Sequence, residues 1–146
     1  MAPLEGVILL SEAMGQRHML DTNIASLIIR DPSSPVRNQL SRATGVCVSA
    51  ITEGEMLFGL AKKPHAFRLG EGVREFLRHI EILPWTSAAA QAYGALRARL
   101  EGEGLPLGTL DTLIAAHAMA EDAILVTRDK ALVRTPGLTV EDWLAA

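Results

Sequence analysis

The sequence has little of what marks a secreted or membrane-bound protein. Its single cysteine, Cys47, excludes an internal disulfide framework and suits a reducing compartment. The apolar run at 7–10 is far too short to span a bilayer, and no basic residue precedes it as in a signal peptide. We therefore expect a cytoplasmic protein without a membrane segment.

Several common catalytic signatures are also missing. There is no phosphate-binding Walker loop, no G-x-G-x-x-G and no G-x-S-x-G. His18, His65 and His79 do not have the spacing of zinc ligands. The net charge of −3 argues against nucleic-acid binding by the surface as a whole. It still allows a phosphate substrate, provided that a cation occupies any acidic cluster and basic residues surround it.

The size and composition fit one globular domain. The chain has 146 residues, of which 49% are hydrophobic and only 4% aromatic, so the core must depend on Leu, Ile, Val and Ala. Residues 1–18 show no convincing period, and we expect them to form an N-terminal extension. Met14 and Met19 are both conceivable starts. Residues 19–146 are then the single domain.

From Met19 onward, short apolar segments alternate with helical patterns. Strands are predicted up to Asp21 and within 46–48, 81–85, 123–126 and 138–140. Helices are predicted over 24–29, 36–42, 51–62, 67–79 and 87–102, with Gly102 as the stop of the last. A further helix is expected to bury Leu110, Leu113, Ile114, His117 and Ala118. This order indicates an α/β fold with a central, mostly parallel sheet and helices on both faces.

Four acids fall where these elements begin or end. They are Asp21, Glu55, Asp111 and Asp129. The carboxyl ends of parallel strands share one edge of a sheet, and ligands bind there. Carboxylates gathered at such an edge repel one another unless a hard cation neutralises them, and oxygen ligands suit Mg²⁺ or Mn²⁺.

Each acid also has a purely structural interpretation. Asp21 is a good helix N-cap, and Glu55 fits a capping box with Thr52. Asp111 suits the dipole of a first helical turn, and Asp129 suits an Asx turn. Glu53 is an alternative to Glu55, but the two point about 200° apart around a helix. Only the set as a whole favours a site.

Two basic pairs and a histidine also have simple structural interpretations. Lys62-Lys63, Arg97 and Arg99 are solvated charges by default and at best contact phosphate. His117 shares the apolar helical face, so we interpret it as a hydrogen-bonded core residue rather than a ligand.

The motifs around these acids resemble a known family. The segments are 19–24 (MLDTNI), 49–56 (SAITEGEM), 83–85 (LPW), 93–97 (YGALR), 108–118 (GTLDTLIAAHA), 125–127 (LVT), 136–138 (PGL) and 141–143 (EDW). They resemble the PIN-domain ribonucleases, in particular the VapC and FitB toxins of bacterial toxin–antitoxin pairs. The segments occur in family order across nearly the whole chain.

The resemblance implies a three-layer PIN-like sandwich and a Mg²⁺- or Mn²⁺-dependent nuclease that cleaves RNA and is silenced by an antitoxin protein. It assigns the acids as the catalytic and metal-binding quartet, with polar helpers beside them. The quartet is Asp21, Glu55, Asp111 and Asp129, and the helpers are Thr22, Asn23 and Thr127. It also implies a homodimer, for which the Ala- and Leu-rich helix 87–102 is a candidate surface.

Within this mechanism, Asp21 and Asp111 are the expected primary ligands. Glu55 is a ligand or a base that acts through water, and Asp129 supports the site or a second ion. Two departures from the family stand out. Residues 130–133 (KALV) replace an Arg-Glu-Phe-like segment, and residues 1–18 have no counterpart.

Two other classes remain as alternatives. One is a phosphoacceptor or phosphatase site. A receiver-like module needs paired acids where Thr22 and Asn23 follow Asp21, and a haloacid-dehalogenase-like phosphatase needs an acid where Asn23 stands. The other is a PIN-like scaffold that binds RNA or protein without catalysis, and the intact quartet argues against it.

Overall fold

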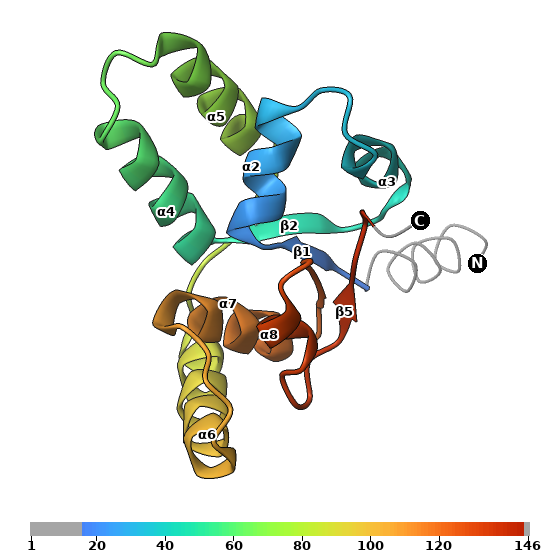
Figure 1. The fold of residues 1–146 in the computed structure, drawn as a ribbon, viewed down its shortest axis with the longest axis vertical. Helices are drawn as coiled ribbons and strands as arrows, with labels where there is room; N and C mark the ends of the chain where they lie inside the picture. Colours follow the sequence, from blue (N-terminus) through green and yellow to red (C-terminus); the bar gives the residue numbers. More distant parts are fainter. Residues whose placement is uncertain (1–15, 145–146) are drawn as a thin grey trace, which may run out of the picture.

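The computed structural model describes residues 16–144, which form a five-stranded sheet in the order β3-β2-β1-β4-β5 (Figure 1). The strands are β1 (His18–Leu20), β2 (Val46–Ser49), β3 (Glu81–Leu83), β4 (Ile124–Val126) and β5 (Val140–Glu141). Every pairing is parallel, and β1 lies at the centre with Met19 beside Cys47 and Leu125. The predicted α/β fold with a parallel sheet is confirmed.

Helices cover both faces of this sheet. They are α2 (Thr22–Arg30), α3 (Val36–Arg42), α4 (Ala50–Ala61), α5 (Phe67–His79), α6 (Ser87–Glu103), α7 (Thr109–Ala120) and α8 (Lys130–Val133). Figure 1 shows α2 to α5 in the upper half and α6 to α8 in the lower half. None of the helices in 16–144 is long and apolar enough to cross a bilayer.

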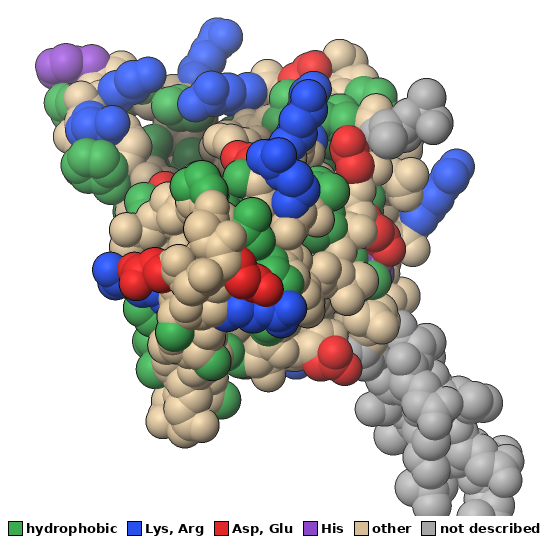
Figure 2. All heavy atoms as spheres, turned by 60° about the horizontal axis from the view of Figure 1, so that its bottom comes forward, with side chains coloured by type: hydrophobic (Ala, Val, Ile, Leu, Met, Phe, Trp, Pro, Cys, Tyr) green, Lys and Arg blue, Asp and Glu red, His purple; other side chains and the backbone are tan. Residues whose placement is uncertain are grey.

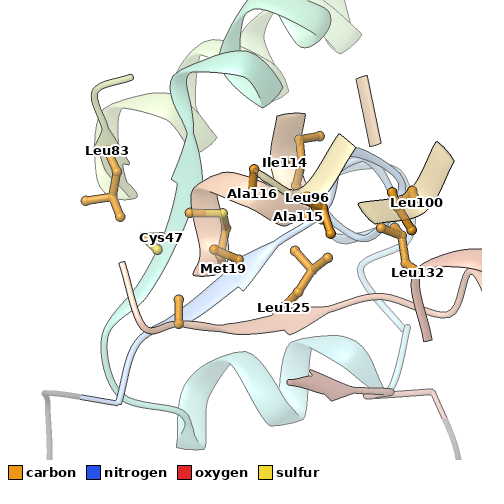
Figure 3. Close-up of a cluster of buried hydrophobic side chains, with 12 residues drawn as sticks. Met19, Cys47, Leu83, Leu96, Leu100, Ile114, Ala115, Ala116, Leu125 and Leu132 are labelled. Carbon is orange, nitrogen blue, oxygen red and sulfur yellow. The ribbon is translucent and has the colours of Figure 1, made fainter. Parts of the chain in front are cut away.

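The strands divide their side chains between two cores. Met19, Cys47 and Leu125 pack with residues of α6, α7 and α8, as Figure 3 shows for one cluster. Their immediate successors Leu20, Val48 and Val126 pack instead with α2, α4 and α5. This alternation follows from the pleat, which points consecutive side chains to opposite faces. Near-continuous apolar strands are therefore what this double-sided sheet requires.

Several predicted details differ from the structure. Helix α6 continues past Gly102 and ends at Gly104, whose φ of 66° suits a residue without a Cβ. Leu110 does not belong to the buried face of α7, because 47% of it is exposed. The 130–133 segment forms the short helix α8, and the last strand begins at Val140 rather than at 138.

The first strand also begins before Met19, inside the segment 1–18 that is predicted to be an N-terminal extension. His18 is part of β1, and its N–H donates to the Gly45 carbonyl over 3.0 Å. The Arg17 carbonyl accepts from the N–H of Ile124 over 2.8 Å. The rest of the predicted extension, residues 1–15, lies outside the described residues.

Candidate metal-dependent nuclease site

The two central strands place two of the acids next to each other. Asp21 follows β1 directly and caps α2, its carboxylate accepting from the N–H of Ile24 over 2.8 Å. Asp129 follows β4 after a two-residue connection and caps α8 by accepting from the N–H of Ala131 over 2.8 Å. Because β1 and β4 are neighbours, both caps stand at the same edge of the sheet.

The other two acids come from helices that follow the sheet edge. Glu55 lies in α4, and Asp111 lies in the first turn of α7. The capping-box interpretation of Glu55 is wrong, because Ser49 rather than Thr52 caps α4, accepting from the N–H of Ile51 over 3.0 Å. Glu55 instead accepts a hydrogen bond from the Thr22 hydroxyl over 3.0 Å.

Three of the four carboxylates, those of Asp21, Glu55 and Asp111, line one cavity. A pocket of about 490 Å³ is lined by Asp21, Thr22, Asn23, Glu55 and residues 108–111. Burial raises the pKa of Asp111, and the neighbouring charges of Asp129, Asp21 and Glu55 raise it further. The charge of Asp129 acts on both Asp21 and Asp111, so Asp129 stands near the cavity although it does not line it.

Asp21 is the most enclosed acid, with only 4% of its surface exposed. Burial raises its pKa, while hydrogen bonds from the Thr127 hydroxyl and the N–H groups of Ile24 and Asn23 act in the opposite direction. The charge of Asp129 raises the pKa again. A buried carboxylate held by several donors is oriented rather than free to rotate, as a ligand must be.

The three predicted helpers have different positions. The Thr127 side chain is fully buried beside Asp21, and its hydroxyl also accepts from the N–H of Asp129 over 3.0 Å. Thr22 holds Glu55, as described above. The Asn23 side chain is exposed at the rim of the pocket, and its backbone N–H is the part that contacts Asp21.

The donor chemistry fits a hard divalent cation, since carboxylate and hydroxyl oxygens line the pocket and no sulfur or imidazole does. Among residues 16–144, however, no three His, Cys, Asp or Glu side chains stand close enough together to hold a metal ion as they are. After burial, the neighbouring carboxylates are the next cause of the raised pKa of Asp111, and a hard cation would offset that repulsion.

His117 is a core residue, as expected, and it connects two of the helices at the site. It is fully buried in α7, with Nδ1 2.7 Å from the hydroxyl of Ser49, the cap of α4. Burial lowers its pKa, so the ring is neutral near pH 7. Sequence reasoning missed the role of Ser49, although a serine directly after a strand is a recognisable N-cap signal.

Residues 18–138 match the PIN domain family. The chain is 34% identical over 129 residues to the tRNA(fMet)-specific endonuclease VapC of Shigella flexneri, covering 87% of this chain and 98% of that protein. It is 36% identical over 130 residues to ribonuclease VapC2 of Rickettsia felis, covering 86% of this chain and 97% of that protein.

Solved structures give the same result. The fold is similar to the DNA-bound VapBC complex of Salmonella typhimurium, with a TM-score of 0.82, 32% identity and coverage of 88% of this chain and 98% of that one. It is similar to VapBC2 of Rickettsia felis bound to a promoter DNA fragment, with a TM-score of 0.81, 32% identity and coverage of 86% and 98%. The chain belongs to the PIN-domain family, in its VapC/FitB branch of ribonucleases.

Proposed function

We propose that the protein is a Mg²⁺-dependent endoribonuclease and the toxin of a toxin–antitoxin pair. The observation that carries the proposal is a pocket lined by Asp21, Glu55 and Asp111, with the charge of Asp129 close enough to act on Asp21 and Asp111. The relatives support the class of reaction, since they are named as ribonucleases and endonucleases. The acids provide the oxygen ligands that phosphodiester hydrolysis with a hard cation needs.

The residues have distinct roles in this proposal. Asp21 and Asp111 are the primary ligands, and Asp129 supports them from the neighbouring strand end. Glu55, held by Thr22, is a ligand or accepts a proton through water. A bound Mg²⁺ or Mn²⁺ supplies a Lewis acid and lowers the pKa of water enough for attack at neutral pH.

A protein partner belongs to the proposal. Structural neighbours of this chain were solved as VapBC and FitAB complexes, so we expect a cognate antitoxin. An acidic pocket selects a basic group, and the planar fork of Arg engages carboxylates in two hydrogen bonds. We also propose a homodimer, in which exposed Ala and Gly positions of α6 pack about a two-fold axis, and a cytoplasmic location.

The decisive experiment is RNA cleavage with Mg²⁺, with Mn²⁺ and with EDTA. We expect EDTA to abolish cleavage. Asp21→Asn should lower cleavage by at least about a hundredfold, because loss of a group that merely orients a metal ligand already costs about 10- to 100-fold. The fold should persist, because Asn also caps helices well. Asp31→Asn is the matched control, since Asp31 follows the same helix and its carboxylate accepts from the N–H and the hydroxyl of Ser33, away from the pocket.

Two results would contradict the nuclease mechanism: undiminished cleavage in EDTA, or full activity of Asp21→Asn. Sedimentation of the purified protein, with and without the product of the neighbouring gene, tests the partners. A strict monomer would refute the homodimer, and the absence of a complex would refute the antitoxin assignment for that gene product.

A further inference from the structure

A second cavity adjoins the acidic pocket and shares two lining residues with it. It has a volume of about 200 Å³ and lies between α2, α4 and α5. Thr22 and Glu55 line both cavities, while Arg30, Lys62 and Lys63 line only the second one. We call this second cavity, with its three basic residues, the cationic groove.

The three cations of the groove have no acidic partner in the part of the chain that the structure describes. Within residues 16–144, none of Arg30, Lys62 and Lys63 has a carboxylate within 4.0 Å. By contrast, Arg97 pairs with Glu101 over 3.1 Å and Arg99 with Glu103 over 3.3 Å on α6. The sequence offers two equivalent basic pairs, and the structure neutralises only one of them.

The surface around the groove combines basic side chains with apolar ones. Figure 2 shows Lys and Arg side chains gathered around a hollow in the upper part of the molecule, with hydrophobic side chains at its base. The apolar lining comes from residues such as Ile29, Met56 and Leu60. Lys62 also lies 4.5 Å from the ring centroid of the exposed Phe58. Cations beside apolar and aromatic surface suit a single-stranded nucleic acid better than a folded duplex.

We propose that the cationic groove binds the phosphates of the RNA strand next to the bond that is cut. The proposal rests on the nuclease function and adds residues for holding the substrate. RNA must approach four carboxylates, and the nearby cations offset that repulsion. Glu55 and Lys62 are seven positions apart on α4, or about 10 Å along its axis. A strand bound at Glu55 therefore reaches the two lysines within a few nucleotides.

The occupant is RNA rather than an acidic protein segment because the groove begins at the acidic pocket itself. A strand whose scissile phosphate reaches Glu55 must continue into one of the adjoining surfaces. The groove is such a surface, and its unpaired cations match the regular charge of a phosphate backbone. Helix α4 ends at Lys62, its C-cap. The structural alternative is therefore that the lysines only balance the negative end of the helix dipole.

The test measures binding in the Asp21→Asn background, in which the RNA stays intact. The probes are a fluorescein-labelled single-stranded RNA and a labelled RNA hairpin, titrated by fluorescence anisotropy over a series of KCl concentrations. Lys62→Ala with Lys63→Ala should weaken binding of the single strand roughly tenfold at low salt. The slope of log Kd against log salt should fall by about 1.4, since each phosphate contact contributes about 0.7 for single strands.

The matched control is Arg97→Ala with Arg99→Ala, which removes the same charge from α6 and should change neither the Kd nor the slope. Lys62→Arg with Lys63→Arg should retain binding because the charge remains. With Asp21 intact, the Lys-to-Ala pair should raise KM and leave kcat nearly unchanged, as for uniform binding. A melting temperature measured for each variant separates these effects from the dipole alternative.

The proposal is overturned if the Lys-to-Ala pair leaves the Kd and the salt slope unchanged, or if the Arg-to-Ala control weakens binding equally. It is also overturned if the lysines affect only the capture of a protein partner. Failure of the nuclease proposal looks different, because RNA would then bind through the groove without being cut in Mg²⁺.

Discussion

Asp21 has two roles that the sequence presented as alternatives. Its carboxylate accepts from the N–H of Ile24 as an N-cap, and the same group lines the pocket with Asp111, near the charge of Asp129. The roles are compatible because a carboxylate has two oxygens and several lone pairs. The cap fixes the orientation of the side chain and leaves acceptor capacity for a cation.

Asp111→Asn should raise the melting temperature of the metal-free protein near neutral pH. The pKa of Asp111 is raised by burial and by three neighbouring acids. Its favourable contribution is therefore complete below the unfolded value of 3.8 and is lost as the pH rises through the raised folded pKa. Replacing the carboxylate with a neutral amide removes this cost at neutral pH. The melting temperature should rise by about 2–4 °C for each kcal/mol of unfolding free energy that is regained.

Thermal melts in EDTA at several pH values check this. The gain should shrink as the pH falls toward the pKa of Asp111, and Asp142→Asn, an exposed acid outside the pocket, should show no such trend. Added Mg²⁺ should stabilise the wild type more than Asp111→Asn. A variant less stable than the wild type at neutral pH without metal would contradict the repulsion argument.

Thr22→Val should reduce RNA cleavage about 10- to 100-fold with little change in stability. The substitution keeps the shape of the side chain but removes the hydroxyl that donates to Glu55 over 3.0 Å. Groups that orient metal ligands have effects of about this size. Steady-state cleavage assays check it, with Thr22→Ser restoring activity and the exposed Thr139→Val as a control. Equal activity of Thr22→Val and wild type would show that Glu55 needs no such support.

At the scale of single elements, two glycines near the end of α6 differ in backbone conformation, although they look alike in the sequence. Gly102 lies within the helix, and Gly104 follows it with a φ of 66°. A Cβ would meet no neighbour within 4 Å at either position, so the backbone alone decides the outcome.

Gly102→Ala should therefore stabilise the protein by about 1 kcal/mol, the propensity difference between the two residues in a helix. Gly104→Ala should destabilise it by about 1–2 kcal/mol, because L-residues are strained in the left-handed region. Urea denaturation of both variants measures the two free energies of unfolding. Changes of the same sign would mean that α6 does not end where the structure places it.

Helices α4 and α7 are joined by one buried polar contact. His117 in α7 meets the hydroxyl of Ser49, which caps α4, and these helices carry Asp111 and Glu55. The two residues are 68 positions apart in the chain. The contact fixes the start of α4 relative to α7, and so constrains where the two acids stand.

At the scale of the whole molecule, β1 depends on residues before Met19. A chain that begins at Met14 should keep the melting temperature of the full chain. A chain that begins at Met19 should melt lower, because it loses the backbone bonds of Arg17 and His18 and the ion pair of Arg17 with Glu81 at 2.6 Å. Circular dichroism melts of both truncations test this. If the Met14 chain does not fold, the earlier residues are structural and the predicted extension is wrong.

The sequence by itself determined the order of elements and the acids at their ends. The helices over 36–42 and 67–79 were predicted with the bounds that the structure shows, because hydrophobic periodicity and breakers such as Pro35 act locally. Strand segments were recognisable because both sheet faces are buried, which demands short apolar runs. The acid-bearing motifs are contiguous in sequence, so they too were readable.

Only the tertiary structure decided which of these groups meet. The strand order brings Asp21 beside Asp129, although 108 positions separate them, and Thr22 binds Glu55 across two helices. Among residues 16–144, it also left Lys62 and Lys63 without a carboxylate partner while Arg97 and Arg99 found partners, and it exposed Leu110 at the start of a largely buried helix. Local pattern cannot decide these matters, because charge pairing and burial depend on through-space neighbours that only chain packing supplies.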